Sequence, residues 1–217
     1  MAPLTVEIWS DVVCPWCYIG KRRFEAAVAE FEHEVDVVWR SFELDPDAPA
    51  TREHSAAEHL AAKYGMSLEQ AQASHAQMTA LAAQEGLEYH FDKARGGNSF
   101  NAHRLIHLAA AHGKQAEAQE RVMRAYFTEG VAIGDREELV ALSVDLGLDP
   151  DEARSALESD AYADAVREDE RLAQRIGING VPFFVLDRTY GVSGAQPVEM
   201  FLSALRTAYE HEGTPAR

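Results

Sequence analysis

The chain has 217 residues, of which 47% are hydrophobic and 26% charged, the profile of an ordinary globular protein with one large domain or two smaller ones. Its formal net charge of −16 argues against a nucleic-acid partner, because proteins that bind phosphate backbones carry basic patches and the longest basic run here is residues 21–23. No stretch approaches the roughly 18 apolar residues of a membrane span, and the N-terminus lacks the basic and apolar regions of a secretory signal. We therefore expect a cytoplasmic protein with no membrane partner.

The first part of the chain predicts a β-α-β unit. Residues 5–9 are β-branched and aromatic, which is typical of a strand. From Pro15 onward, apolar residues recur every three or four positions as far as Phe31, which indicates a helix. Residues 35–42 then carry apolar side chains on both faces, the pattern of a covered strand in a parallel sheet.

The middle of the chain predicts helices and no strand. Ala, Glu, Gln and Leu dominate between residues 51 and 177, and residues that cap or end helices recur there. Ser67 and Asn98 are expected to be N-caps, and Asp149 with Pro150 is expected to start a further helix. The expected helices cover 52–64, 67–85, 99–112, 115–128, 136–147, 151–158 and 161–176, with Gly65, Gly86 and Gly113 as terminators.

Strands return near the end of the chain. Residues 182–186 and 189–192 are short apolar runs joined by a turn at Asp187 and Arg188, and a last helix is expected from about Pro197. The order is then β-α-β, helices, β-β-α, so we predict an α/β thioredoxin fold interrupted by an all-helical insertion. The predicted domains are a thioredoxin-like domain of residues 1–46 and 177–217 and a helical insertion domain of residues 47–176.

The chain has only two cysteines, three positions apart. In a reducing compartment such a pair indicates redox or metal chemistry, and a zinc site needs about four ligands, so we expect no metal. Cys14 lies where the helix begins, and the free backbone N–H groups and positive dipole end found there favour a thiolate. We predict that Cys14 is the nucleophile and that Cys17, one turn further on, resolves the mixed disulfide formed on it.

Four neighbours of the cysteines are candidates to shape the site. Pro15 suits the first helical turn, and Trp16 has an indole N–H but no charge, so we expect a less oxidising pair than one with histidine at that position. Gly-Val-Pro precedes the apolar strand, at the place where a thioredoxin-type site has a cis proline. A cis Pro182 exposes the backbone of Val181 for strand-like pairing with a substrate, whereas the alternative is a trans proline at a strand start.

Three motifs, in order along the chain, resemble a known family. They are Ser-Asp-Val-Val-Cys-Pro-Trp-Cys-Tyr-Ile-Gly-Lys at 10–21, Gly-Val-Pro-Phe-Phe-Val at 180–185 and Val-Ser-Gly-Ala-Gln-Pro at 192–197. Together they resemble the DsbA-like thioredoxin superfamily, and in particular its cytoplasmic FrnE-like branch, over nearly the whole chain. The resemblance implies disulfide oxidoreductase activity with a helical lid over the redox site. Kappa-class glutathione transferases and 2-hydroxychromene-2-carboxylate isomerases are similar more distantly, since they usually have serine at the position of Cys14.

Five further residues are candidates to line a cleft. Phe42 leaves the second strand at the edge where the site is expected, and plain packing explains it equally well. The resemblance also places the start of one insertion helix beside the cysteines, with Asn98, Phe100, Asn101 and His103. Asn98 has the alternative use of an N-cap, and His103 is a candidate proton relay.

Other conspicuous residues are assigned to packing or to solvent. Trp9 and Trp39 belong to the core by their periodicity. The acidic run at 168–170 is interpreted as the solvated face of a helix.

Three functions remain as hypotheses. The first is a thiol–disulfide oxidoreductase that needs no bound cofactor beyond its redox-active disulfide and exchanges with a protein or a small thiol, glutathione among them. The second is a glutathione-dependent isomerase or transferase, and the third is a non-catalytic, chaperone-like binding module. The direction of electron flow and the oligomeric state are left open by the sequence, because an acidic surface favours solubility and no particular stoichiometry.

Overall fold

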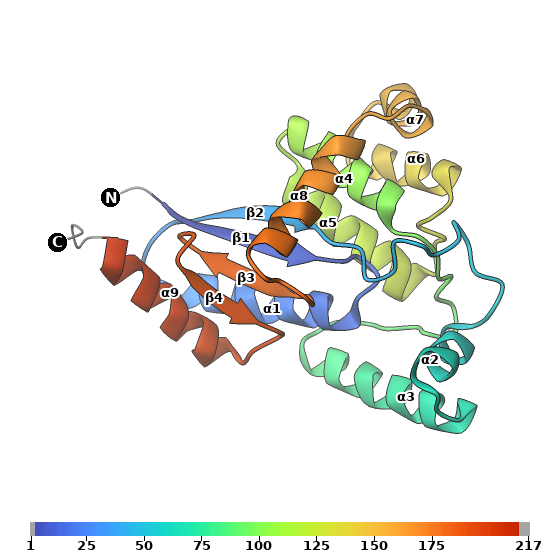
Figure 1. Ribbon diagram of the computed structural model, residues 1–217, viewed down its shortest axis with the longest axis horizontal. Helices are drawn as coiled ribbons and strands as arrows, with labels where there is room; N and C mark the ends of the chain where they lie inside the picture. The colour runs from blue at the N-terminus through green and yellow to red at the C-terminus, as the bar shows by residue number, and fades with distance from the viewer. Residues whose placement is uncertain (1–2, 213–217) are drawn as a thin grey trace. The chain divides into compact units, whose positions relative to one another are not determined.

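The computed structural model describes residues 3–212 (Figure 1). Its four-stranded sheet has the order β2-β1-β3-β4. β1 is parallel to β2 and antiparallel to β3, and β3 is antiparallel to β4. This mixed sheet, with a helical insertion between β2 and β3, confirms the predicted α/β thioredoxin fold. The strands are β1 (Leu4–Ser10), β2 (Val35–Ser41), β3 (Phe183–Leu186) and β4 (Tyr190–Ser193).

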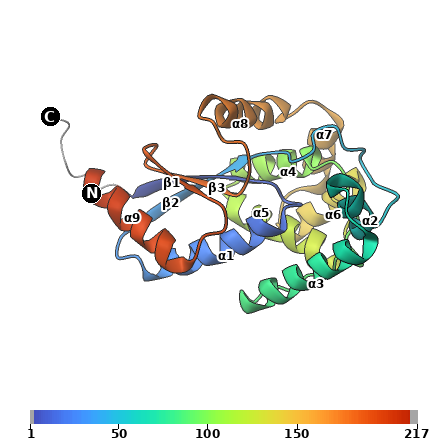
Figure 2. The same ribbon diagram turned by 60° about the horizontal axis from the view of Figure 1, so that its bottom comes forward.

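One face of the sheet packs against two helices, α1 (Pro15–Glu30) and α9 (Val198–Glu212). Figure 2 shows these two helices side by side, and they are in contact. Phe184 of β3 lies between them, with its ring centroid 5.2 Å from that of Phe24 in α1 and 4.6 Å from that of Phe201 in α9. This aromatic cluster is the centre of the main hydrophobic core.

The opposite face of the sheet has a smaller core. Because side chains alternate along a strand, Trp9 of β1 and Val185 of β3 point to this side. Trp9 is fully buried there against Ala173 and Ile178. Ala173 belongs to α8 (Ala163–Arg175), so the end of the last insertion helix packs on the sheet.

The contacts divide the chain into two compact units. One comprises Met1–Phe42 with Asp169–Arg217, and the other is Glu43–Glu168. The boundaries expected from the sequence, after residues 46 and 176, differ from these limits. The reason is that the second half of α8 belongs with the sheet, where the Trp9 indole N–H donates a hydrogen bond to the main-chain oxygen of Asp169.

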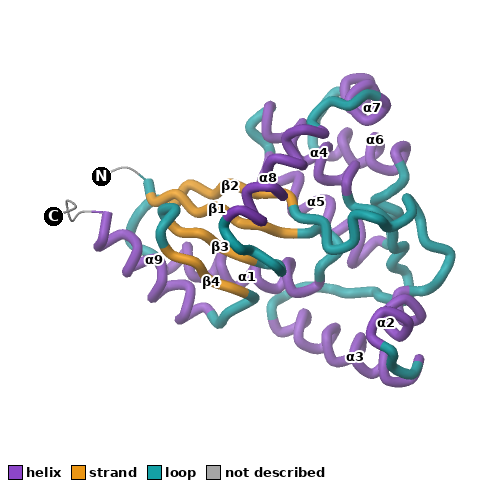
Figure 3. The backbone as a smooth tube through the Cα atoms, in the orientation of Figure 1, coloured by secondary structure: helices purple, strands orange, loops and turns teal. Residues whose placement is uncertain are grey.

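Residues 43–168 form helices and loops and contain no strand (Figure 3). Ser55 and Ser67 each form a capping box with the residue three positions on, which confirms Ser67 as an N-cap; the helix expected from residue 52 starts only after Ser55. None of the described helices of either unit is long and apolar enough to cross a membrane. The helices here are α2 (Ala56–Tyr64), α3 (Leu68–Gln84), α4 (Phe100–Ala111), α5 (Gln115–Arg124), η1 (Ala125–Glu129), α6 (Arg136–Asp145), α7 (Pro150–Glu158) and the first part of α8.

Two expectations about single elements are wrong. The segment predicted as one helix at 115–128 is α-helical only as far as Arg124, and η1 is a turn of π-helix that ends at Gly130 in the left-handed region (φ 75°). The second strand is not covered on both faces. β2 is parallel to β1 as predicted, but it lies at the edge of the sheet and its Asp36 is exposed.

Candidate functional site

The two cysteines lie at the start of α1. Cys14 is the N-cap residue, in an extended conformation, and Pro15 occupies the first turn. Cys17 follows one turn later and lies 3.4 Å from Cys14. Both cysteines are buried free thiols, whereas Trp16 between them is 43% exposed. One thiol is therefore at the N-terminal end of the helix and the other is inside its first turn.

The environment of Cys17 keeps it protonated. Burial raises the pKa of Cys17 well above its ordinary value, and the hydrogen bond and charge of Cys14 raise it further. The backbone of Asp11 and the side chain of Ser10 act in the opposite direction but do not outweigh these effects. At neutral pH Cys17 is a neutral thiol, so Cys14 is the better placed of the two for a first attack.

A distant segment of the same unit contacts Cys14. The Cys14 thiol donates a hydrogen bond to the main-chain oxygen of Val181, with 3.7 Å between sulfur and oxygen, across 167 residues of sequence. The peptide bond between Val181 and Pro182 is cis. A Cβ atom at Gly20 would lie 3.0 Å from Cγ of Pro182, so glycine at this helical position allows α1 and the proline loop to come close.

The same unit contains a buried support for the sheet, centred on Asp169, that the sequence does not reveal. The acidic run at 168–170 predicts a solvated helix face, and this is wrong for Asp169, which is only 2% exposed. The helical spacing carries a signal for this, because Val166, Asp169 and Ala173 lie on one face of α8 and all three are buried. Asp169 accepts hydrogen bonds on its main-chain oxygen from Trp9 and on Oδ2 from the N–H of Ser41.

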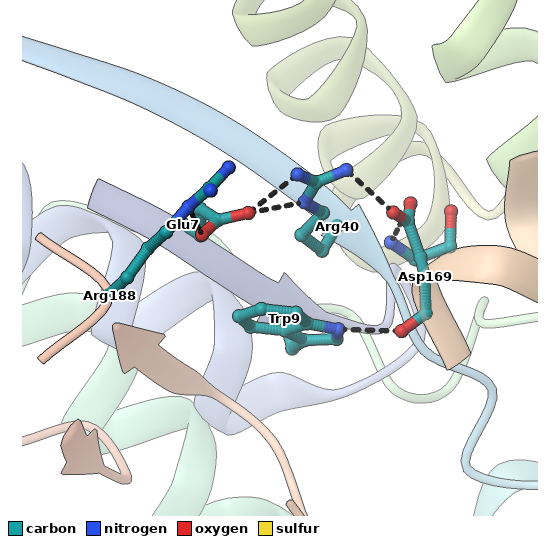
Figure 4. Close-up of polar contacts among 6 residues, drawn as sticks. Glu7, Trp9, Arg40, Asp169 and Arg188 are labelled. Atoms are coloured by element: carbon teal, nitrogen blue, oxygen red, sulfur yellow. Dashed lines mark hydrogen bonds and ion pairs between the residues drawn. The ribbon is translucent and has the colours of Figure 1, made fainter. Parts of the chain in front are cut away.

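Arg40 connects this support to β1 (Figure 4). Its guanidinium donates to Oε1 of Glu7 from Nε at 3.0 Å and from Nη2 at 2.5 Å, and to Oδ1 of Asp169 at 2.9 Å. Burial lowers the pKa of Arg40, but the bonds and charges of the two carboxylates outweigh it, so the pKa is raised and the cation is stabilised. Two strands and one helix are thus held together by one ionic group.

The candidate cleft residues fall in both units. Phe42 is half-buried against the smaller core of the sheet unit. Phe100, Asn101 and His103 belong to residues 43–168, and their proximity to the cysteines stays a prediction. Phe100 has the guanidinium carbon of Arg167 4.3 Å from its ring centroid, Asn101 accepts a hydrogen bond from the arginine three positions on, and His103 is buried.

Asn98 has a clear structural use within its unit. Its Nδ2 donates to Oε1 of Glu43 at 3.0 Å and to the main-chain oxygen of Pro46 at 3.1 Å. Its Oδ1 accepts from the N–H of Phe100 at 2.9 Å. The helix boundary makes Ser99 the N-cap of α4, without a side-chain bond; the N-cap expected at Asn98 is thus displaced by one residue, although its side chain serves the same N-terminus.

We expect Asn98→Ala to lower the free energy of unfolding by about 2–4 kcal/mol, because three hydrogen bonds are lost and Glu43, whose side chain is fully buried, loses one of its donors. Chemical denaturation measures the change. Asn179→Ala is the matched control, since exposed Asn179 donates one bond to the main-chain oxygen of Gly177. Unchanged stability combined with slower disulfide exchange would assign Asn98 to the site instead of to the fold.

The sequence and the fold match known proteins. Residues 5–206 match the DSBA-like thioredoxin domain. The crystal structure of a probable DsbA oxidoreductase from Streptomyces coelicolor is similar, with 50% identity and a TM-score of 0.93 over 99% of this chain and 93% of that one. The uncharacterized protein YwbO of Bacillus subtilis is 29% identical over 212 residues, which are 92% of this chain and 94% of YwbO.

A more distant structure shares the fold. The cytosolic disulfide reductase DsbM from Pseudomonas aeruginosa is 20% identical, with a TM-score of 0.67 over 96% of this chain and 100% of that one. Within residues 3–212, no group of three or more His, Cys, Asp or Glu side chains is arranged to hold a metal ion. The family match spans most of the sequence, including both cysteines and Pro182. The chain belongs to the family of DsbA-like thioredoxin domains.

Proposed function

We propose that this protein is a thiol–disulfide oxidoreductase and that Cys14 and Cys17 are its working pair. The observation that carries the proposal is the asymmetry of the pair. Cys14 is the N-cap residue of α1 and contacts the main-chain oxygen of Val181, whereas Cys17 lies inside the first turn, where burial raises its pKa. The family and the 50% identity to a probable DsbA oxidoreductase support the same reaction.

The reaction proceeds in two steps that balance. The Cys14 thiolate attacks one sulfur of a substrate disulfide, so a mixed disulfide forms on Cys14 and the other substrate sulfur leaves as a thiolate. Cys17 then loses its proton and attacks the sulfur of Cys14, which closes the Cys14–Cys17 disulfide and releases the second substrate thiolate. Two electrons pass from the protein dithiol to the substrate, and the reverse sequence oxidises a substrate dithiol.

Val181 and Pro182 are proposed to position the substrate. Cys14 already contacts the main-chain oxygen of Val181, so a substrate segment bonded to Cys14 would lie beside the same backbone and pair with it as a strand does. Pro15 and exposed Trp16 border the pair on the helix side. The substrate class is a disulfide or thiol on a protein or a small molecule, with glutathione as a candidate co-substrate.

We also propose that the protein works in the cytoplasm and belongs to the FrnE-like branch. The three sequence motifs support the branch. The number of cysteines supports the cytoplasmic location. Both belong to the proposed redox pair, so none is left for a structural disulfide of the kind common in secreted proteins.

A redox titration in glutathione buffers tests the proposed function. Tryptophan fluorescence follows the state of the pair, since Trp16 lies between the two cysteines. We expect a reversible two-electron transition that Cys17→Ser lacks. A midpoint near about −120 mV indicates an oxidant and one near about −270 mV a reductant. Absence of any transition in this range, with saturable glutathione binding retained in Cys17→Ser, would favour a glutathione-dependent isomerase or transferase instead.

Trp16→His is expected to raise the reduction potential by about 30 mV or more, equivalent to roughly 1.4 kcal/mol. A protonated imidazole next to Cys14 stabilises the thiolate and therefore the reduced form, which the uncharged indole does not. Trp16→Phe is the matched control, because it removes the indole without adding charge, and its potential should move much less. An unchanged or lowered potential in Trp16→His contradicts this account of Trp16.

A further inference from the structure

A pocket of about 270 Å³ opens on the sheet face that carries Trp9, within the unit that also holds the cysteines. This volume lies just below the range of sites for drug-sized molecules, roughly 300–1,000 Å³, and suits a smaller ligand. Glu7, Arg40 and Arg188 supply its charged side. The apolar side is formed by Trp9, Leu172, Ile176 and Val185.

On the charged side of the pocket, Arg40 forms close ion pairs and Arg188 forms only a loose one. Both carboxylates of the buried group, those of Glu7 and Asp169, share the single guanidinium of Arg40. In Figure 4, Arg40 lies between these two carboxylates and Arg188 approaches Glu7 from the other side. Glu7 therefore has two arginines within ion-pair distance, Arg40 on one side and Arg188 on the other.

Glu7 has one carboxylate oxygen that Arg40 does not bond. Its side chain is only 6% exposed, and both of its hydrogen bonds from Arg40 end on Oε1. Among the described residues, the partner of Oε2 is Nε of Arg188 at 3.6 Å, beyond hydrogen-bond length. The Arg188 side chain is 83% exposed, and so loose an ion pair at the surface contributes little.

We propose that this pocket binds a small organic monocation, an alkylguanidinium or alkylammonium, whose charged head pairs with Glu7 in place of Arg188. The head group supplies the short, charge-assisted hydrogen bonds that Oε2 lacks. The alkyl chain lies along Leu172, Ile176 and Val185, where it leaves water. The net charge of −16 raises the local concentration of cations around the protein. This ligand site goes beyond the proposed redox function and does not depend on it.

The same head group occurs free in solution and on the arginine and lysine side chains of proteins. We assign the free compound, because a volume of about 270 Å³ matches a small molecule, whereas a peptide also loses the conformational freedom of its flanking residues. An arginine-containing peptide is therefore expected to bind at least about tenfold more weakly than n-butylguanidinium. Tighter binding of the peptide would make the pocket a protein-docking site and overturn the small-molecule assignment.

Titration calorimetry with n-butylguanidinium tests the site, with the Trp9 indole N–H signal as a local probe. We expect Glu7→Gln to weaken binding at least about tenfold, since a charged acceptor becomes neutral. Arg188→Ala is expected to strengthen it several-fold, because the competing cation is removed. Arg206→Ala is the matched control, since Arg206 is an exposed arginine of α9 paired with Glu32, and should leave the affinity unchanged.

Glu7→Gln is expected to weaken binding and Arg188→Ala to strengthen it, so the test does not depend on whether one variant folds. Arg188 is exposed, so its removal leaves the buried group intact even if Glu7→Gln impairs folding. Methylguanidinium should bind more weakly than n-butylguanidinium if the apolar side takes part. Binding is expected to persist in Cys14→Ser, which separates this site from the redox function. No saturable binding to Arg188→Ala, or equal affinity in wild type and Glu7→Gln, overturns the proposal.

Discussion

Replacing Cys14 by serine is expected to reduce disulfide exchange to the uncatalysed rate, because a serine hydroxyl is not ionised at neutral pH and cannot form the mixed disulfide. Cys17→Ser should behave differently. It keeps the first attack and loses the second, so a mixed disulfide on Cys14 accumulates. Glutathione disulfide is a suitable probe, with thiol release measured spectroscopically and the adduct by mass spectrometry.

The raised pKa of Cys17 adds a pH dependence to the second step. Because the protonated form of Cys17 is favoured well above its ordinary range, its thiolate fraction grows about tenfold for each pH unit below that pKa, and release of the trapped product should accelerate accordingly. Stopped-flow measurements between neutral and alkaline pH follow this step in the wild type. Turnover by Cys14→Ser, or an adduct on Cys17 in place of Cys14, would falsify the assignment of the nucleophile.

Arg40→Met is expected to lower the free energy of unfolding by about 3–5 kcal/mol, the usual cost of removing one partner from a buried ion pair. Here the loss leaves two carboxylates, those of Glu7 and Asp169, without the guanidinium that bridges them. The side chain of Asp169 is 2% exposed and that of Glu7 6%, so water cannot fully replace the lost bonds.

Chemical denaturation of the reduced protein measures this change. Arg206→Met is the control, because the Arg206 side chain is 49% exposed and bonds both oxygens of Glu32, so its removal should alter stability little. Adding Glu7→Gln to Arg40→Met should restore part of the loss, since one buried charge is then removed. Equal effects of Arg40→Met and Arg206→Met would show that the buried group contributes no more than a surface pair.

Much of the fold could be predicted because its signals are local. Ser67 caps a helix with Gln70 three positions on, and the cysteines start α1 where Pro15 can occupy its first turn. The strands read as apolar runs bounded by turn residues. These features depend on neighbours within four residues, which a sequence pattern displays directly.

The buried support around Asp169 could not be predicted because it depends on strand register. Trp9 lies opposite Arg40 in the parallel pair of β1 and β2, which places Glu7 and Arg40 on the same face as Trp9. Nothing in the spacing of these residues specifies that alignment or the return of α8 to the same face. An acidic residue such as Asp169 therefore reads as solvated until its partners, more than a hundred residues away, are known.

The pairing of β1 with β3 has a consequence for biosynthesis. Val6 of β1 lies opposite Leu186 of β3. β1 therefore cannot pair with β3 until most of the chain has been synthesised, which takes on the order of ten seconds or more at ordinary elongation rates. Cys14 and Cys17 emerge early, whereas Val181 emerges late. Glu43–Glu168 is continuous in sequence and all of it emerges before β3. The redox site is thus among the last parts of the molecule to be assembled, and a chain truncated before β3 leaves the inner edge of β1 exposed for pairing with other strands.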